Sequence, residues 1–143
     1  MNFAFYGQVI TTDRQRVRCV HDRQVVDAAA RVAAVGGRIV RDFFDVYPDG
    51  HRVWRHRRHA RRLLNELADQ AGRGFDAVIV SDTRSAFSSY QYDLVLSLCT
   101  MHNAQLWVPE IEGPVVEDNT EHQRIMMELF WGTAPPWPPA GHG

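Results

Sequence analysis

The chain has 143 residues, of which 45% are hydrophobic and 23% charged, so it is long enough for one domain with a single core and is not a disordered polypeptide. Its formal net charge of −1 conceals an asymmetry, because residues 1–62 carry 13 Arg and 6 Asp, whereas residues 63–143 carry 3 Arg and 11 acidic residues. The basic half predicts an anionic partner.

Two cysteines, Cys19 and Cys99, are too few for a disulfide framework, which favours a reducing, cytoplasmic location. The longest apolar stretch, VVDAAARVAAVGG, contains Asp27 and Arg31, and the N-terminus has no basic region followed by an apolar run. The sequence therefore predicts neither a membrane span nor an export signal.

The first half of the chain predicts two strands and one helix. Residues 3–10 (FAFYGQVI) form an apolar run rich in aromatic and β-branched residues, which is typical of a buried parallel strand. Apolar residues recur every three or four positions from residue 22 to residue 34 and predict a helix, which Gly36 and Gly37 end. Residues 38–44 (RIVRDFF) then indicate a second strand.

The second half continues this alternation. The turn residues Pro48, Asp49 and Gly50 predict a loop after the second strand. The elements expected after it are a helix at residues 55–72, a strand at 75–81, a helix at 90–101, a strand at 104–110 and a helix at 120–130. Thr120 and Gln123 have the spacing of a capping box, so we expect the last helix to begin there.

These elements define an α/β fold. Strands that alternate with helices of this length predict one domain with a mainly parallel β-sheet of about four strands, flanked by helices on both faces. We expect this domain to span residues 1–132. The last stretch, GTAPPWPPAGHG, has four prolines and no periodicity, which predicts a disordered tail at residues 133–143.

Ligands in open α/β sheets bind where the carboxyl ends of the strands meet, so the loops after the strands are the candidate site. The three loops are residues 10–15, 45–58 and 81–89. The second leads into HRVWRHRRHARR, which holds six Arg and three His in twelve residues. Guanidinium groups bind phosphate bidentately and attach to a nucleic acid backbone without regard to sequence. The predicted phosphate-binding residues are Arg52, Arg55, Arg57 and Arg58.

Histidines in the same segment raise the question of a metal site. His51, His56 and His59 are possible ligands, but the arginines between them repel cations, and no Cys or carboxylate pair completes a ligand set. We therefore predict no metal and no cofactor. The polar residues of the third loop could bind phosphate oxygens or serve only as turn residues. They are Ser81, Asp82, Arg84, Ser85, Ser88 and Ser89.

Taken together, five segments resemble the catalytic domain of the serine recombinases, the resolvase and invertase family, in the version typical of actinobacterial genomes. FYGQVITTDRQ is similar to a family pattern of Tyr-x-Arg-x-Ser-Thr-x-x-Gln. The other segments are GGRIVRDFFD, RGFDAVIVSD followed by AF, QLWVPEIEGPV and EHQRIMMELF. The resemblance covers about residues 3–132 and rests on the order and spacing of the set rather than on one motif.

The resemblance implies a resolvase-like fold and DNA strand exchange. Family members attack a backbone phosphate with a serine hydroxyl and form a phosphoserine link, while several arginines stabilise the phosphoryl charge. In this chain Ile10 occupies the position of the nucleophile, and Gln8 occupies the position of an arginine. Thr11 supplies a neighbouring hydroxyl, but adjacent side chains on an extended strand point to opposite sides. The resemblance therefore implies a degenerate active site.

Four further positions bear on the implied catalytic set. Arg57 matches an arginine of the second loop, Gln15 matches the polar residue that closes the first, and Asp82 matches an acid of the third. Arg84 lies one position before the place of another arginine, which Ser85 occupies. Gln15 and Asp82 have an alternative interpretation that we weigh equally: their side chains cap a loop and have no part in catalysis.

We therefore expect a site-specific DNA recombinase catalytic-domain homologue without strand exchange. It would bind DNA weakly through the backbone and form a homo-oligomer, or a hetero-oligomer with an intact recombinase. The tail stands where family members continue into a basic dimerisation helix, so our hypothesis is a truncated or frameshifted gene. Two alternatives remain open: a non-catalytic regulator that binds DNA or a recombinase, and a small anion- or nucleotide-binding α/β domain. The second lacks a Gly-rich phosphate loop after a strand.

Overall fold

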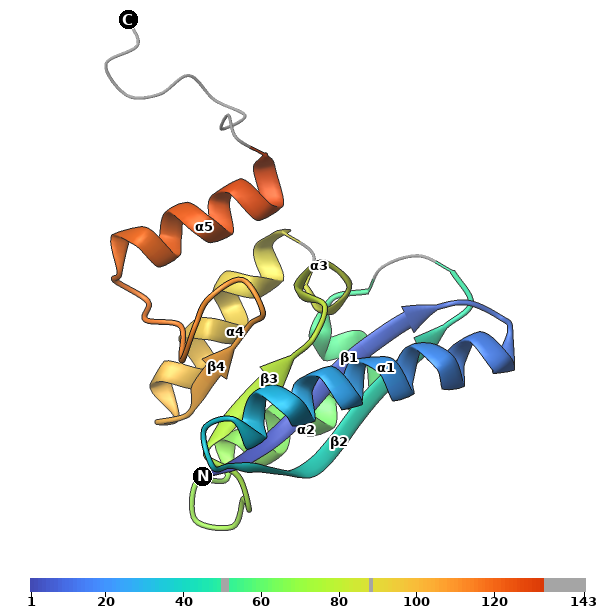
Figure 1. Cartoon of the computed structure of the whole chain (residues 1–143), viewed down its shortest axis with the longest axis horizontal. Coiled ribbons are helices and arrows are strands. Elements are labelled where there is room, and N and C mark those ends of the chain that lie inside the picture. Colours follow the sequence, from blue (N-terminus) through green and yellow to red (C-terminus); the bar gives the residue numbers. More distant parts are fainter. Residues whose placement is uncertain (50–51, 88, 133–143) are drawn as a thin grey trace, which may run out of the picture.

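The structure is a computed structural model that describes residues 1–49, 52–87 and 89–132. In this part of the chain, four parallel strands form one sheet. The strands are β1 (Asn2–Ile10), β2 (Arg38–Tyr47), β3 (Ala77–Val80) and β4 (Gln105–Trp107). Their order across the sheet is β2-β1-β3-β4, and each neighbouring pair is parallel (Figure 1). The predicted sheet is confirmed.

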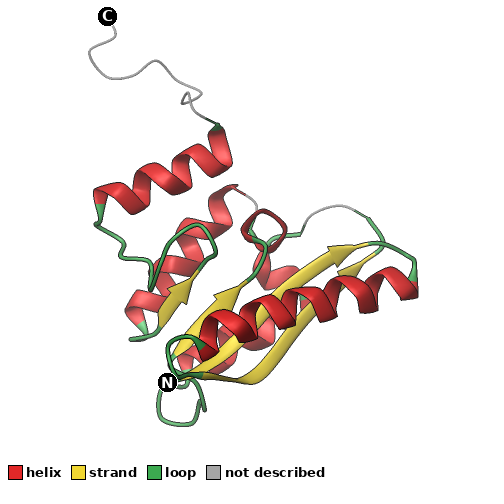
Figure 2. Cartoon of the chain, in the orientation of Figure 1, coloured by secondary structure: helices red, strands yellow, loops and turns green. Residues whose placement is uncertain are grey.

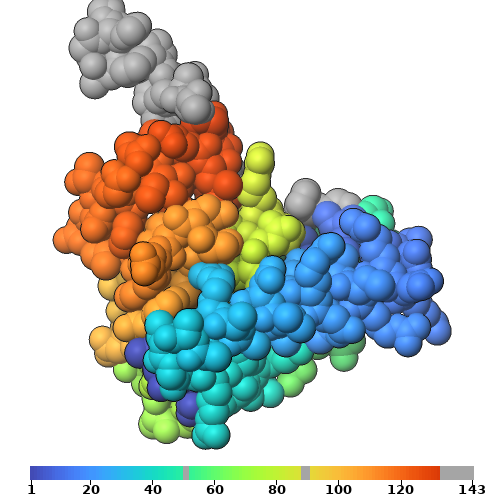
Figure 3. All heavy atoms as spheres, viewed as in Figure 1, coloured from blue at the N-terminus to red at the C-terminus, as the bar shows by residue number. Residues whose placement is uncertain are grey.

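Helices flank the sheet on both faces, as predicted. They are α1 (Arg14–Ala33), α2 (Arg58–Ala68), the short α3 (Thr83–Ala86), α4 (Ser89–Met101) and α5 (Thr120–Trp131), with a 3₁₀ turn η1 (Trp54–His56). Helix α1 packs on one face, and α2 and α4 pack on the other (Figure 2). The space-filling view shows α1 extending along the face that it covers (Figure 3). Helix α5 reaches α4 through a contact between the rings of Tyr92 and Phe130.

Strand β1 contributes to two hydrophobic cores, because successive residues of a strand point to opposite faces. Phe3 and Phe5 pack in the core beneath α1, whereas Ala4 and Tyr6 pack in the larger core beneath α2 and α4. Strand β3 alternates in the same way, and all four of its residues are buried. Burial on both faces explains why these strands are continuous apolar runs.

Helix α1 begins earlier than predicted, at Arg14 rather than at residue 22. The carboxylate of Asp13 caps it by accepting hydrogen bonds from the backbone N–H of Gln15 at 2.9 Å and of Arg16 at 3.5 Å. The first turn consists of exposed polar residues, so hydrophobic periodicity did not reveal it. The first loop is correspondingly shorter than expected.

Other predicted boundaries shift for similar local reasons. Helix α2 is shorter than residues 55–72, because η1 precedes it and the chain turns after Ala68. Strand β2 continues to Tyr47, β4 is shorter than residues 104–110, and the third loop contains α3. The sequence pattern located the helices and strands but did not predict the turns at which they begin and end.

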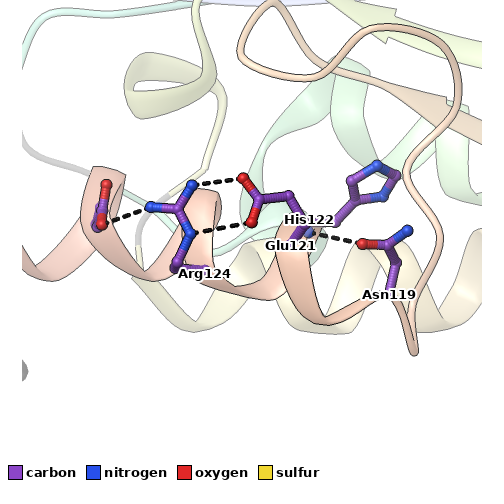
Figure 4. Close-up of polar contacts among 5 residues, drawn as sticks. Asn119, Glu121, His122 and Arg124 are labelled. Carbon is purple, nitrogen blue, oxygen red and sulfur yellow. Dashed lines mark hydrogen bonds and ion pairs between the residues drawn. The ribbon is translucent and has the colours of Figure 1, made fainter.

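The cap of α5 differs from the predicted capping box. Asn119, rather than Thr120, is the capping residue, and its side-chain oxygen accepts a hydrogen bond from the backbone N–H of His122 at 3.0 Å (Figure 4). The side chain of Gln123 donates instead to the carbonyl of Glu117 at 3.0 Å. The capping-box prediction is therefore wrong by one residue at its first member, because an asparagine at the preceding position caps at least as well.

Two sequence predictions concern the chain as a whole. Within the described residues, no helix combines the length and the apolar character that a membrane crossing requires. The predicted tail at residues 133–143 lies outside the described residues. The proposed domain of residues 1–132 ends at the last residue that the structure describes.

Arg73 joins two helix ends at the edge of the sheet where the strands begin. Its guanidinium donates hydrogen bonds to the carbonyl of Leu67 at the end of α2 (2.9 Å) and to the carbonyl of His102 just after α4 (2.8 Å). It also donates to the carbonyls of Phe75 at 3.0 Å and Asn103 at 3.2 Å. A cation at the carboxyl ends of helices is favourable for their dipoles, so Arg73 fastens both to the sheet.

The substitution Arg73→Ala should lower the free energy of unfolding by about 2–3 kcal/mol, because four carbonyl groups lose a charged donor. Urea denaturation followed by circular dichroism measures this loss. Arg23→Ala, on the exposed side of α1, is the matched control and should change the value by less than about 0.5 kcal/mol. Equal effects of the two substitutions would contradict the role given to Arg73.

Candidate functional site

A buried polar cluster lies at the carboxyl ends of β1 and β2. Tyr6 and Arg57 are 0% exposed, and Gln8 and Asp45 are 1% exposed. Gln8 and Asp45 face each other in the register of the two strands, and Arg57, from the loop before α2, contacts the hydroxyl of Tyr6. Two of these four residues, Gln8 and Arg57, are positions that the sequence analysis assigned to the candidate site.

The carboxylate of Asp45 organises this cluster. It accepts hydrogen bonds from the hydroxyl of Tyr6 at 2.8 Å and from the backbone N–H groups of His59 at 2.7 Å and Ala60 at 2.9 Å. The hydroxyl of Tyr47 accepts a further bond from the N–H of Arg58 at 2.6 Å. Side chains of β2 therefore cap α2, and a negative charge sits at its N-terminus, where the helix dipole favours it.

Burial fixes the protonation of Tyr6. Removal from water raises the pKa of the Tyr6 hydroxyl far above its ordinary value, and the neighbouring Asp45 charge raises it further. Arg57 acts in the opposite direction but does not outweigh burial. Tyr6 therefore remains a neutral donor to Asp45.

Arg57, a predicted phosphate-binding residue, is fully buried, and its side chain points into the protein. Its Nε donates to the carbonyl of Arg52 at 2.6 Å, and its Nη1 donates to the carbonyl of Ala86 at 2.5 Å and lies 3.3 Å from the Tyr6 hydroxyl. Its Nη2 is buried and has no partner among the described residues. Trp54, a large apolar side chain of the same loop, is also fully buried.

The backbone carbonyls of residues 85 and 86 accept hydrogen bonds from three side chains. Trp54 donates through Nε1 to the carbonyl of Ala86 at 2.8 Å, beside Arg57, and its ring stacks on Phe87. Gln8 donates through Nε2 to the carbonyl of Ser85 at 3.3 Å, and Ser85 Oγ donates to the carbonyl of Gln8 at 3.4 Å. Arg57, one of the predicted phosphate-binding residues, thus binds a peptide carbonyl of the third loop, and Gln8 binds its neighbour.

Ile10 and Thr11 stand at the end of β1. Ile10 pairs with Tyr47 of β2 and is partly buried. The backbone N–H of Thr11 donates to the carbonyl of Tyr47 at 2.9 Å, and its hydroxyl accepts a bond from the N–H of Asp13 at 3.1 Å. The Thr11 hydroxyl therefore supports the turn that leads into α1.

Three further candidate site residues come from the first and third loops. Two lie at the start of a helix, and the third lines a different cavity. Gln15 is an exposed residue in the first turn of α1. Asp82 caps α3 by accepting a bond from the backbone N–H of Ser85 at 3.2 Å. Arg84 lines a separate cavity of about 250 Å³ together with residues of α1, including Arg23 and Asp27. The structure does not bring Arg84 together with Arg57.

The arginines of the second loop also divide. Arg52 lies over the ring of Tyr47 at 4.1 Å and forms a long ion pair with Asp49 at 3.8 Å. Arg55 and Arg58 are exposed. Of the four predicted phosphate-binding residues, Arg57 is therefore the one that the fold withdraws from the surface.

Sequence reasoning missed Asp45 and Trp54 as site residues. Asp45 was placed in a loop, although an acid inside the apolar run FFDVY signals a buried carboxylate that needs donors. Trp54 stands among charged residues, and an isolated large apolar residue in such a stretch signals an anchor. Among the described residues, no group of three or more His, Cys, Asp or Glu side chains is arranged to hold a metal ion.

Comparison with known proteins identifies the fold. The N-terminal catalytic domain of TP901-1 integrase is similar with a TM-score of 0.68 and 18% sequence identity, covering 90% of this chain and 91% of that one. The C-terminal catalytic domain of ISC1926 TnpA, an IS607-like serine recombinase, has a TM-score of 0.59 at 12% identity, covering 95% and 89%. A resolvase family site-specific recombinase from Streptococcus pneumoniae has a TM-score of 0.57 at 14% identity, covering 87% and 83%.

The chain therefore has the fold of the serine-recombinase catalytic domain, as the resemblance predicted. No protein-family model and no curated protein sequence matches it. These structural similarities, at identities of 12–18%, concern the fold, and the chemistry of this chain depends on its own residues.

The substitution Asp45→Asn should lower the free energy of unfolding by about 2–4 kcal/mol, because a neutral amide accepts weaker bonds and offers an unpaired donor in a buried site. Denaturant titration measures the loss. Asp42→Asn, on the same strand but with a side chain that is 44% exposed, should cost less than about 1 kcal/mol. A small effect at Asp45 would contradict its role as the organising charge.

Proposed function

We propose that this chain is a serine-recombinase-type catalytic domain that binds the DNA backbone and does not cleave it. The observation that carries the proposal is the end of β1, where the resemblance places the nucleophile and the chain has Ile10. An aliphatic side chain has no atom that can attack phosphorus. The fold shared with recombinase catalytic domains supports the DNA-related part of the proposal.

The contacts around this position agree with a loss of chemistry. Phosphoryl transfer needs cations placed around the phosphate, where they stabilise developing negative charge. The amide of Gln8 is neutral and bonds to the Ser85 carbonyl, and the Nη1 of Arg57 bonds to the Ala86 carbonyl. In this conformation neither side chain is presented to a phosphate outside the protein.

Thr11 does not replace the missing serine under this proposal. Its side chain follows Ile10 on an extended backbone and so points to the other side of the strand. Its hydroxyl already accepts a hydrogen bond from the backbone of the turn before α1. Moving it onto a phosphate would break that turn and release the Asp13 cap.

A second candidate is a non-catalytic regulator that associates with an intact recombinase. A cavity of about 400 Å³ between α4 and α5 favours it, since apolar side chains make up much of its lining. Two of them, Met127 and Trp131, are 40% and 38% exposed. Co-purification with an active recombinase, lost on Met127→Glu, would favour this candidate, and a monomer indifferent to any recombinase would count against it.

The proposal predicts that the wild-type protein forms no covalent adduct with DNA. Supercoiled plasmid is incubated with the protein, the reaction is quenched with denaturant, and adducts are sought by gel electrophoresis and mass spectrometry. An active serine recombinase on its own plasmid is the positive control. A phosphothreonine adduct at Thr11, abolished by Thr11→Val, would overturn the proposal.

A further inference from the structure

We infer that the nucleic acid backbone is bound by the outer face of α2, through three exposed arginines at its start and a fourth just before it. We name Arg55, Arg58, Arg61 and Arg62 the α2 arginine face. The inference rests on the proposed binding of DNA and locates it away from the degenerate active site. It also adds Arg61 and Arg62 to the residues expected from the loop.

The periodicity of α2 brings these arginines together. Ala60, Leu63 and Leu67 are its buried residues and face the core. Residues three and four apart lie on one side of a helix, so Arg58 neighbours both Arg61 and Arg62. All three are exposed, on the side away from the sheet. The core-facing stripe thus fixes the direction of the basic face.

No carboxylate neutralises this face among the described residues. None of its four arginines takes part in an ion pair there. Glu66 lies four residues after Arg62, the spacing of a helical ion pair, yet it accepts two bonds from Arg41 of β2. This bond to Glu66 also raises the pKa of Arg41.

Helix α5 contains an arginine whose charge is neutralised by ion pairs within the same helix. Arg124 lies between Glu121 and Glu128, three residues before it and four after it, and bonds to both (Figure 4). The α2 arginine face lacks any such partner in the described residues. The charge on α2 is therefore available to a molecule outside the chain.

The arrangement on α2 carries an energetic cost that the fold does not need. Like charges three and four residues apart destabilise a helix, and cations near a helix N-terminus oppose its dipole. The carboxylate of Asp45 offsets part of this cost, because it places a negative charge at the N-terminus of α2. An anionic partner would offset the rest and explain why the arginines are clustered.

A phosphate backbone fits this face better than an acidic protein surface. The basic residues of this chain are all arginine, whose planar guanidinium pairs bidentately with phosphate. A nucleic acid offers several phosphates in a row, so that a cluster of arginines can be engaged at once, with release of counterions. The face has no apolar anchor of the kind that protein interfaces use.

The test compares two triple variants with the same loss of charge. Arg58→Gln/Arg61→Gln/Arg62→Gln removes three charges from the α2 face, and Arg14→Gln/Arg16→Gln/Arg18→Gln removes three exposed charges from α1, on the other face of the sheet. Fluorescence anisotropy with a labelled duplex of arbitrary sequence measures affinity at several salt concentrations. Thermal unfolding checks that both variants are folded.

The α2 variant should bind the duplex at least about 10-fold more weakly than the wild type, and its log–log salt slope should fall by about 2–3. The α1 variant should lose less than about 3-fold. Equal losses in the two variants, or no loss in either, would overturn the α2 face while leaving wild-type DNA binding intact. Wild-type protein that does not bind DNA would overturn the DNA-binding part of the proposed function itself.

A competition experiment separates the two kinds of polyanion. Polyglutamate is titrated against the protein–duplex complex at matched total charge. Poor displacement by polyglutamate supports phosphate as the ligand. Displacement by polyglutamate at lower charge concentration than unlabelled duplex would overturn the assignment to nucleic acid.

Discussion

The carboxyl edge of this sheet depends on one buried charge, the carboxylate of Asp45. It joins β1 through Tyr6 and α2 through two backbone N–H groups, so that three elements meet at one side chain. A negative charge there offsets the positive end of the helix dipole and the arginines around it. At the other end of α2, Arg73 donates to the carbonyl of Leu67 and supplies the opposite charge. The backbone groups at both ends of α2 are thus hydrogen-bonded to side chains from outside the helix.

If the proposed function is correct, the same edge shows how a recombinase-type fold is kept while its chemistry is lost. Gln8, Trp54 and Arg57 donate to the carbonyls of residues 85 and 86, so these donors are occupied by the protein's own backbone. These contacts join β1 and the second loop to the third loop. Under the proposed function, the former reaction centre has become part of the core, and recognition of DNA has moved to charges on the surface of α2. Stability and binding can then be altered by different substitutions.

Much of the fold was predictable because it follows from local patterns. Strand β1 is buried on both faces and so is apolar throughout, which composition reveals. The site was less predictable, because its residues act across the fold. Asp45 caps a helix whose first bonded N–H lies 14 residues further along the chain, so no local cap signal exists. Arg57 was predicted from a motif, but the sequence did not reveal that its side chain is buried beside Trp54. Arg84, which stands one position before the place of a family arginine, lines a cavity with residues of α1.

The dependence of α2 on outside partners has a consequence for folding. Eleven residues with like charges at their start are too short and too repulsive to be a stable helix alone, since isolated helices below about 12–15 residues are marginal in water. Helix α2 should therefore form together with β2 and the segment around Arg73, as one cooperative unit. Its arginines would then be arrayed on one side when the domain is folded and scattered along a coil when it is not. A partly folded chain would carry the same charge without presenting the same surface.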